Sequence, residues 1–215
     1  WAVSQCHAMV DGVNKALERY DFGEAGRLVY QSLWDNYADW YIEASKTRFQ
    51  GGAAANSPEA KAARQTLVYV LDLTLRALHP FKPYVTQILW QQLTRAERHE
   101  ALIVAEWPEM EGGLAQDAAA TDTFGTLQSL VRLVRNARAE YNVDLGKKIP
   151  ATLTITDDKL RSNFADEGAA ICALAKIDPE GFAIQGAVEG GGPPQELADT
   201  KTVHIVVADG GEAWL

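Results

Sequence analysis

Residues 22–30 read Phe-Gly-Glu-Ala-Gly-Arg-Leu-Val-Tyr, and residues 39–46 read Asp-Trp-Tyr-Ile-Glu-Ala-Ser-Lys. Together with the residues between them they predict one long amphipathic helix from about Phe22 to Arg48. Asp21 supplies an N-cap, and Glu24 follows three residues later in the arrangement of a capping box. The apolar side chains of this helix repeat at helical spacing and are expected to be buried: Ala25, Leu28, Leu33, Tyr37, Trp40, Tyr41 and Ala44.

Four further helices are expected around this segment. Apolar residues at helical spacing predict a helix over residues 2–19. The run Ser57-Pro58-Glu59 combines a capping hydroxyl, a proline at the first helical position and an acid in the first turn, so a third helix begins there. That helix ends at His79-Pro80, because proline disfavours the α conformation in the residue before it. The remaining two helices are predicted over residues 83–93 and 121–142.

The pattern changes after Pro150. Residues 152–156 alternate between apolar and polar side chains like a strand, and residues 203–207 and 177–184 are further strand candidates. A helix is expected over residues 160–174, and residues 102–108 are expected to be extended. Loops are predicted over residues 51–57, 109–120 and 190–194, and Leu145-Gly146 is expected to stop the fifth helix.

These elements predict a mainly α protein: an antiparallel helical bundle followed by a small α+β segment. The boundary is placed near residue 148, with the bundle over residues 1–148 and the α+β segment over residues 149–215. A segment of that size is marginal for independent folding, so it is expected to depend on the bundle.

Composition restricts the possible functions. The chain has 215 residues and a formal charge of -9, which argues against a general nucleic-acid coat but leaves room for a local basic patch. No apolar run approaches the roughly 20 residues that span a bilayer. Cys6 and Cys172 are far apart in apolar contexts, so two buried reduced thiols are expected.

A basic patch is predicted at the end of the fifth helix. Between residues 125 and 150 there are five basic residues and two acids, Glu140 and Asp144. The pattern is compatible with phosphate docking, but by itself it favours a solvated helix face that has acid partners within the chain. Two further candidates for phosphate contact, Lys46 and Arg48, lie at the end of the second helix. The five basic residues are Arg132, Arg135, Arg138, Lys147 and Lys148.

Other chemistries find little support. The four histidines lie in four different elements without a serine, cysteine or second histidine at a suggestive spacing, so no catalytic or metal site is expected. The aromatic residues at positions 34, 37, 40 and 41 raise the idea of base stacking, but their helical spacing predicts that most of them pack in the core. The glycine run at 190–192 lacks the lysine of a phosphate loop.

Several segments resemble one family. The Phe-Gly-Glu-Ala and Arg-Asn-Ala-Arg stretches are similar to valyl-tRNA synthetases, and the His-Pro-Phe and Trp-Pro elements are shared with related class I synthetases for branched-chain amino acids. The segments occur in the family's order: residues 20–30 with 39–46, Leu78–Thr86 with Leu89-Trp90, Ala105–Pro108, and Val134–Asn142 with Gly146–Lys148.

The resemblance implies a domain that binds the anticodon stem and loop of tRNA-Val. The whole enzyme of this family activates valine with ATP and Mg, transfers it to the 3′ end of the tRNA, and hydrolyses mischarged threonine at an editing site. Its partners are therefore tRNA-Val and the catalytic and editing domains of the same enzyme, with no membrane and no DNA. A cytoplasmic or organellar location is expected.

The chain also departs from the family pattern. The catalytic signatures, the editing domain, the first bundle helix with its Asn-Lys-Leu-Trp-Asn pattern and the C-terminal coiled-coil arm are missing from the 215 residues. The chain is therefore expected to have no catalytic site and no cofactor of its own. An alternative interpretation is a synthetase-derived domain recruited as a non-catalytic structural or interaction module in a larger assembly.

Overall fold

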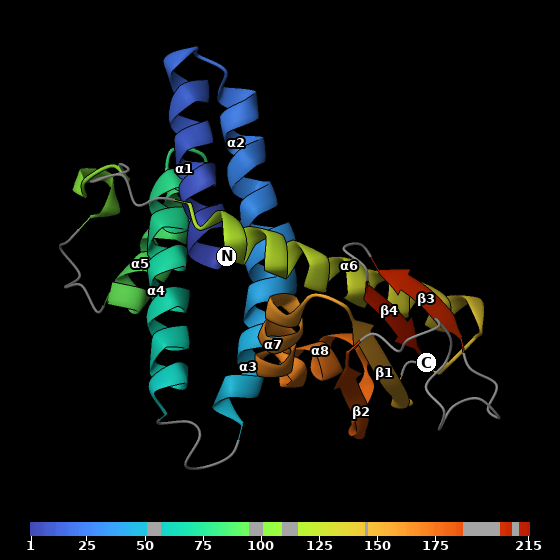
Figure 1. The fold of residues 1–215 in the computed structure, drawn as a ribbon. Coiled ribbons are helices and arrows are strands. Elements are labelled where there is room, and N and C mark those ends of the chain that lie inside the picture. Colours follow the sequence, from blue (N-terminus) through green and yellow to red (C-terminus); the bar gives the residue numbers. More distant parts are fainter. Residues whose placement is uncertain (51–56, 95–100, 109–115, 145, 187–202, 208–210) are drawn as a thin grey trace. The chain divides into compact units, whose positions relative to one another are not determined.

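The computed structural model describes residues 1–50, 57–94, 101–108, 116–144, 146–186, 203–207 and 211–215. The chain forms two compact units, Trp1–Ala118 and Ala119–Leu215, which are called unit 1 and unit 2 below. Each unit is described by itself, and Figure 1 labels the elements of both.

Unit 1 is helical. In Figure 1, α1, α2 and α4 run side by side, and α5 packs beside α4. Its elements are α1 (Ala2–Glu18), α2 (Phe22–Gln31), the π-helix η1 (Ser32–Ile42), α3 (Glu43–Lys46), the 3-10 helix η2 (Thr47–Phe49), α4 (Pro58–Leu78), α5 (Pro83–Thr94) and the 3-10 helix η4 (Leu102–Val104).

The predicted helix over residues 22–48 is present, but it changes hydrogen-bond type along its length. Residues 32–42 are π-helical, a form that is rare beyond single turns. Ser32 and Tyr37, five residues apart, are both buried, and the Tyr37 hydroxyl donates to the Leu67 carbonyl at 3.0 Å. A π-helix has a longer repeat than an α-helix, so this spacing keeps both side chains facing the core.

The predicted helix starts in unit 1 are confirmed. The Asp21 carboxylate accepts from the Glu24 amide at 3.1 Å, and the Ser57 hydroxyl accepts from the Ala60 amide at 3.1 Å. The second half of the predicted capping box is wrong, because the Glu24 side chain pairs with Arg27 at 2.6 Å and the Asp21 amide donates to the Ala16 carbonyl at 2.9 Å. The helix before His79 ends at Leu78, as the following proline predicts.

The core of unit 1 is built from small and medium side chains of α1, α2 and α4, including Val10, Val13, Val29 and Ala77. A smaller cluster of Leu75, Trp90 and Leu102 joins α4 to α5 and η4. The expectation that residues 102–108 are extended is wrong for 102–104, which form a 3-10 turn. The Leu102 amide donates to the Gln87 side chain at 2.7 Å and ties that turn to α5.

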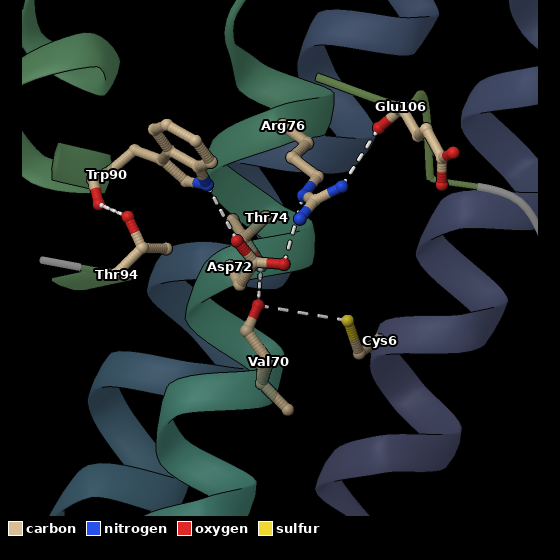
Figure 2. Close-up of polar contacts among 8 residues, drawn as sticks. All are labelled: Cys6, Val70, Asp72, Thr74, Arg76, Trp90, Thr94 and Glu106. Atoms are coloured by element: carbon tan, nitrogen blue, oxygen red, sulfur yellow. Dashed lines mark hydrogen bonds and ion pairs between the residues drawn. The ribbon is translucent and has the colours of Figure 1, made fainter. Parts of the chain in front are cut away.

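A polar cluster lies beside this core, as Figure 2 shows. The Trp90 indole donates to Asp72 at 2.8 Å, and the other oxygen of Asp72 pairs with Nε of Arg76 at 3.0 Å. Nη1 of Arg76 donates to the Glu106 carbonyl at 3.1 Å. The Asp72 carboxylate thereby connects α4 to α5 and, through Arg76, to the segment after η4.

Unit 2 combines helices with a mixed four-stranded sheet. The strand order is β2-β1-β4-β3, with β1 parallel to β2 and antiparallel to β4, and β3 antiparallel to β4. Its elements are α6 (Ala118–Glu140), β1 (Ile149–Ile155), α7 (Asp158–Asp166), α8 (Gly168–Ala175), β2 (Ile177–Gln185), β3 (His204–Val207) and β4 (Gly211–Trp214).

The connection from β1 to β2 through α7 and α8 is a crossover, which parallel strands require. Phe164, Ile171 and Ile177 are almost completely buried. A Cβ atom at Gly181 would lie 2.8 Å from the Pro150 side chain, so only glycine allows β2 to approach β1 at this point.

The fold class of a helical bundle with a small α+β appendage is confirmed. The unit boundary lies before α6, whereas the sequence places a domain boundary after it, near residue 148. The helix expected over residues 160–174 is two helices, and β4 was not predicted as a strand. The loop expected over residues 109–120 is wrong for 118–120, where α6 begins, and its residues 109–115 lie outside the described residues, as do 51–56 and 190–194 of the other expected loops. In the described part of the chain, no helix has the length and apolar character of a membrane span.

Candidate nucleic-acid interface

The basic residues of α6 occupy three different environments. The apolar stripe of the helix, with Leu127, Leu130 and Val134, is buried. Arg132 is exposed. Arg135 is also an exposed residue, but its Nε and Nη2 donate to the Leu174 carbonyl at 3.1 and 2.9 Å.

Arg138 is buried, with only 5% of the residue exposed. Its Nη1 donates to the Lys176 carbonyl at 3.2 Å, and its Nη2 donates to the carbonyls of Asp144 and Lys147 at 2.8 and 2.7 Å. Within the described ranges Arg138 forms no ion pair. The guanidinium is therefore satisfied by carbonyl dipoles and not by a carboxylate.

The α6–β1 loop, residues 141–148, follows directly. Asn142 adopts the left-handed conformation with φ 53°, and the Val143 amide returns to the Arg138 carbonyl at 2.8 Å. The Asp144 carboxylate accepts from the Gly146 amide at 2.7 Å, and the Asp144 carbonyl accepts from the Lys147 amide at 3.1 Å.

The predicted stop at Leu145-Gly146 is wrong by several residues, because α6 ends at Glu140. Asparagine tolerates the left-handed conformation, so Asn142 is the signal that could have located this end. Leu145 itself lies outside the described residues.

Lys147 and Lys148 are exposed on this loop. Lys148 also acts on α8: burial and the charge of Asp178 raise the pKa of the Cys172 thiol, and the charge of Lys148 lowers it. The structure thus brings Arg138, Lys147 and Lys148 together at one end of α6, with Arg135 one turn earlier. Whether these residues contact RNA stays a prediction.

Lys46 and Arg48 belong to unit 1. The Lys46 ammonium pairs with Glu43 at 2.6 Å on an exposed surface. Arg48 is half-buried, and its charge contributes to lowering the pKa of Glu59, after the hydrogen bonds of Glu59 to its own backbone and to Ser57. These two cations share their surface with acids, whereas Arg138 has only carbonyl partners.

The histidines have local partners. His7 contacts the Tyr69 hydroxyl at 2.8 Å, and burial lowers its pKa. His79 contacts the Thr86 hydroxyl at 2.7 Å. Over the described ranges, no group of three metal-ligating side chains is present. The two cysteines are free and buried, as expected.

The aromatic residues of the second helix are divided. Tyr37 and Trp40 are buried, in agreement with their expected core positions, and Tyr41 is half-buried. Trp34 is 50% exposed and lies against the exposed ring of Tyr30, with centroids 6.2 Å apart. Trp34 is the exception among the residues expected in the core.

A family model described as "Anticodon-binding domain of tRNA ligase" matches residues 1–154. The chain belongs to this family. The match covers all of unit 1, α6, the α6–β1 loop and most of β1, so the basic end of α6 lies inside the family domain.

The relatives of this chain are valine–tRNA ligases, in agreement with the resemblance to valyl-tRNA synthetases. It is 37% identical over its whole length to the chloroplastic/mitochondrial valine–tRNA ligase 2 of Arabidopsis thaliana. It is 37% identical over 96% of its length to the valine–tRNA ligase of Streptomyces avermitilis, and over 80% of its length to that of Anoxybacillus flavithermus. The matched regions span 21%, 22% and 19% of these relatives, about a fifth of each.

Proposed function

We propose that this chain binds the anticodon stem and loop of tRNA-Val and positions the tRNA for aminoacylation by a valine–tRNA ligase. The observation that carries the proposal is the anticodon-binding family match over residues 1–154, together with valine–tRNA ligases as relatives along the chain. Catalysis with ATP and Mg belongs, in this proposal, to the catalytic and editing domains. The chain itself takes no cofactor and works in the cytoplasm or an organelle.

The contacts proposed for RNA are electrostatic. Arg132 is exposed on α6, and Lys147 and Lys148 are exposed on the α6–β1 loop, so these three residues are the main candidates for phosphate contacts. Lys46 and Arg48 are secondary candidates, because acids in unit 1 share their surroundings. Contacts to phosphates position a protein on RNA and make its affinity depend on salt.

The test is a fluorescence-anisotropy titration of the purified chain with a tRNA-Val anticodon stem-loop, and with a stem-loop of swapped anticodon, over a salt series. Salt-sensitive binding with preference for the valine anticodon is expected. Equal affinity for the two stem-loops, or no binding, contradicts a recognition role for the chain alone and favours the assembly-module alternative.

A variant locates the phosphate contacts. Arg132→Gln is expected to lower the slope of log affinity against log salt by about 0.7, the loss of one contact to a single strand. Arg27→Gln is the matched control, because Arg27 is also an exposed helical arginine but belongs to α2 of unit 1 and is not among the candidate phosphate contacts. A slope equal to wild type in Arg132→Gln, or an equal loss in Arg27→Gln, removes Arg132 from the interface.

A further inference from the structure

We propose that Arg138 is a positioning residue: from inside unit 2 it holds the α6–β1 loop so that Lys147 and Lys148 face an RNA backbone. The inference rests on the proposed function, because it concerns the same basic site. It gives Arg138 no direct contact with RNA and places the two exposed lysines at the phosphates.

The first support is the set of carbonyls that Arg138 binds. Asp144 and Lys147 belong to the α6–β1 loop, and Lys176 is the left-handed residue between α8 and β2, with φ 57°. One side chain therefore joins the loop to the helix before it and to the crossover. A guanidinium suits this task, because its donors are fixed in a planar fork, whereas a lysine has one compact ammonium.

The second support is charge. A buried cation is ordinarily paired with an acid, and none of the ion pairs among the described residues involves Arg138. Carbonyl dipoles stabilise the guanidinium without cancelling its net charge. The positive field of Arg138 therefore adds to that of Lys147 and Lys148, which follow Arg138 by nine and ten residues and lie on the α6–β1 loop.

The third support is the direction in which the loop backbone is held. Arg138 binds the carbonyls of Asp144 and Lys147 from the buried side, so these acceptors are engaged and do not oppose an approaching phosphate. The Lys147 backbone is fixed twice, by its carbonyl on Arg138 and by its amide on the Asp144 carbonyl. A fixed backbone reduces the ordering that binding requires.

The test is a double-mutant cycle on the salt slope of anticodon stem-loop binding. It uses Arg138→Gln, the pair Lys147→Gln with Lys148→Gln, and all three changes together. Losing both lysine contacts is expected to lower the slope by about 1.4, and Arg138→Gln is expected to produce a drop of up to the same size because both lysines lose their placement. The combination is expected to remain near 1.4, because the buried guanidinium touches no phosphate and its field counts for less than one contact.

Direct contact by Arg138 gives a different result. Arg138→Gln would then lower the slope by about 0.7 and the combination by about 2.1, because three independent contacts would be lost. Additive losses of this kind overturn the inference, and so does an unchanged slope in Arg138→Gln. Arg138→Lys keeps the charge but not the fork, so failure of Arg138→Lys to restore the slope supports positioning, and full restoration overturns it.

A measurement without RNA separates this inference from the proposed function. Trypsin cleaves after Lys147 and Lys148, and a loop released by Arg138→Gln is expected to be cleaved there faster than the measured free energy of unfolding of this variant accounts for. If wild type binds no stem-loop while Arg138→Gln speeds cleavage, the proposed function fails and the ordering role stands. If wild type binds while Arg138→Gln changes neither cleavage nor slope, the inference fails alone.

A second pair of variants covers the case in which Arg138→Gln does not fold. Asp144→Ala removes the side-chain acceptor of the Gly146 amide, whereas Asp144→Asn keeps an acceptor and removes only the charge. Loss of a negative charge by itself strengthens RNA binding. Weaker binding by Asp144→Ala than by Asp144→Asn therefore supports an ordered loop as the requirement, and equal affinities of the two variants overturn it.

Discussion

Arg76 in unit 1 is partly buried and Arg138 in unit 2 is buried, and the two guanidinium groups are satisfied in different ways. In unit 1, Arg76 pairs with Asp72 at 3.0 Å, and Asp72 also accepts from the Trp90 indole (Figure 2). In unit 2, Arg138 is more deeply buried, and its partners are the carbonyls of Asp144, Lys147 and Lys176.

The difference separates a stabilising arginine from one that also contributes charge. The Asp72 carboxylate cancels the charge of Arg76, so this pair joins helices and adds little to the field outside. The carbonyls leave the charge of Arg138 in place beside two exposed lysines. In the proposal above, this uncancelled charge belongs to the phosphate-binding surface.

The largest effect that would sharpen this contrast is expected at Asp72. Asp72→Ala removes the ionic partner of Arg76 and the acceptor of the Trp90 indole, and should lower the free energy of unfolding by about 2–3 kcal/mol. Urea unfolding followed by tryptophan fluorescence measures it. The RNA salt slope should remain that of wild type at temperatures where the variant is folded.

Asp72→Asn is the matched control. It keeps an acceptor for Trp90 and loses only the ion pair with Arg76, so its destabilisation should be the smaller of the two. A fall in the RNA salt slope in Asp72→Ala would break the contrast, because unit 1 would then also set the charge at the interface.

The buried thiol of Cys6 in unit 1 should make stability depend on alkaline pH. Burial raises the pKa of the Cys6 thiol from 9.0 to about 12. The folded state therefore keeps the neutral thiol while the unfolded chain ionises above pH 9. Stability from this group is complete below pH 9 and is lost as the pH rises toward 12. Between pH 9 and pH 10 the loss should be about 1 kcal/mol.

Comparison of wild type with Cys6→Ala in urea unfolding at pH 8, 9 and 10 isolates this loss. The variant should show the smaller decrease in stability, because it lacks the Cys6 thiol. Burial also raises the pKa of Tyr37 to about 12, but Tyr37 is present in both proteins and ionises in the unfolded chain only near pH 10. Cys172→Ala is the corresponding variant in unit 2, where burial also raises the pKa of the Cys172 thiol. Parallel pH profiles for wild type and Cys6→Ala would remove the proposed titration from the account.

The smallest of the three effects is expected at a helix cap that both units use. Asp157 accepts from the Leu160 amide at 2.6 Å at the start of α7, as Asp21 does from Glu24 in unit 1. Asp157→Ala should lower stability by about 0.5–1 kcal/mol. Thermal unfolding of Asp157→Ala beside Asp157→Asn, which keeps the acceptor, measures the cap. No difference between the two would mean that the amide finds another partner.

Local signals predicted the helices well, because their causes lie within a few residues. Ser57-Pro58 and Asp21 start helices by side-chain caps three residues away, and Pro80 ends one by a clash with its neighbour. The π-helix over residues 32–42 was not predicted, since apolar spacing does not distinguish it from an α-helix over such a length.

The candidate site was predicted by position and not by role. Charge counting located the basic end of α6, because charge is a property of the sequence. It could not separate exposed Arg132 from buried Arg138, although both lie on one helix, six residues apart. The Lys176 carbonyl that engages Arg138 is 38 residues away and arrives only through the crossover between β1 and β2.

The sequence by itself determined the helical class, the capped helix starts, the basic end of α6 and the likeness to valine–tRNA ligases. Each of these features depends only on which residue types lie within a few positions of one another. The tertiary structure alone decided which cations are enclosed and by what. Burial and hydrogen-bond partners depend on segments far apart in the chain, and the carbonyls of Leu174 and Lys176 reach α6 only when the chain after β1 has folded through α7 and α8.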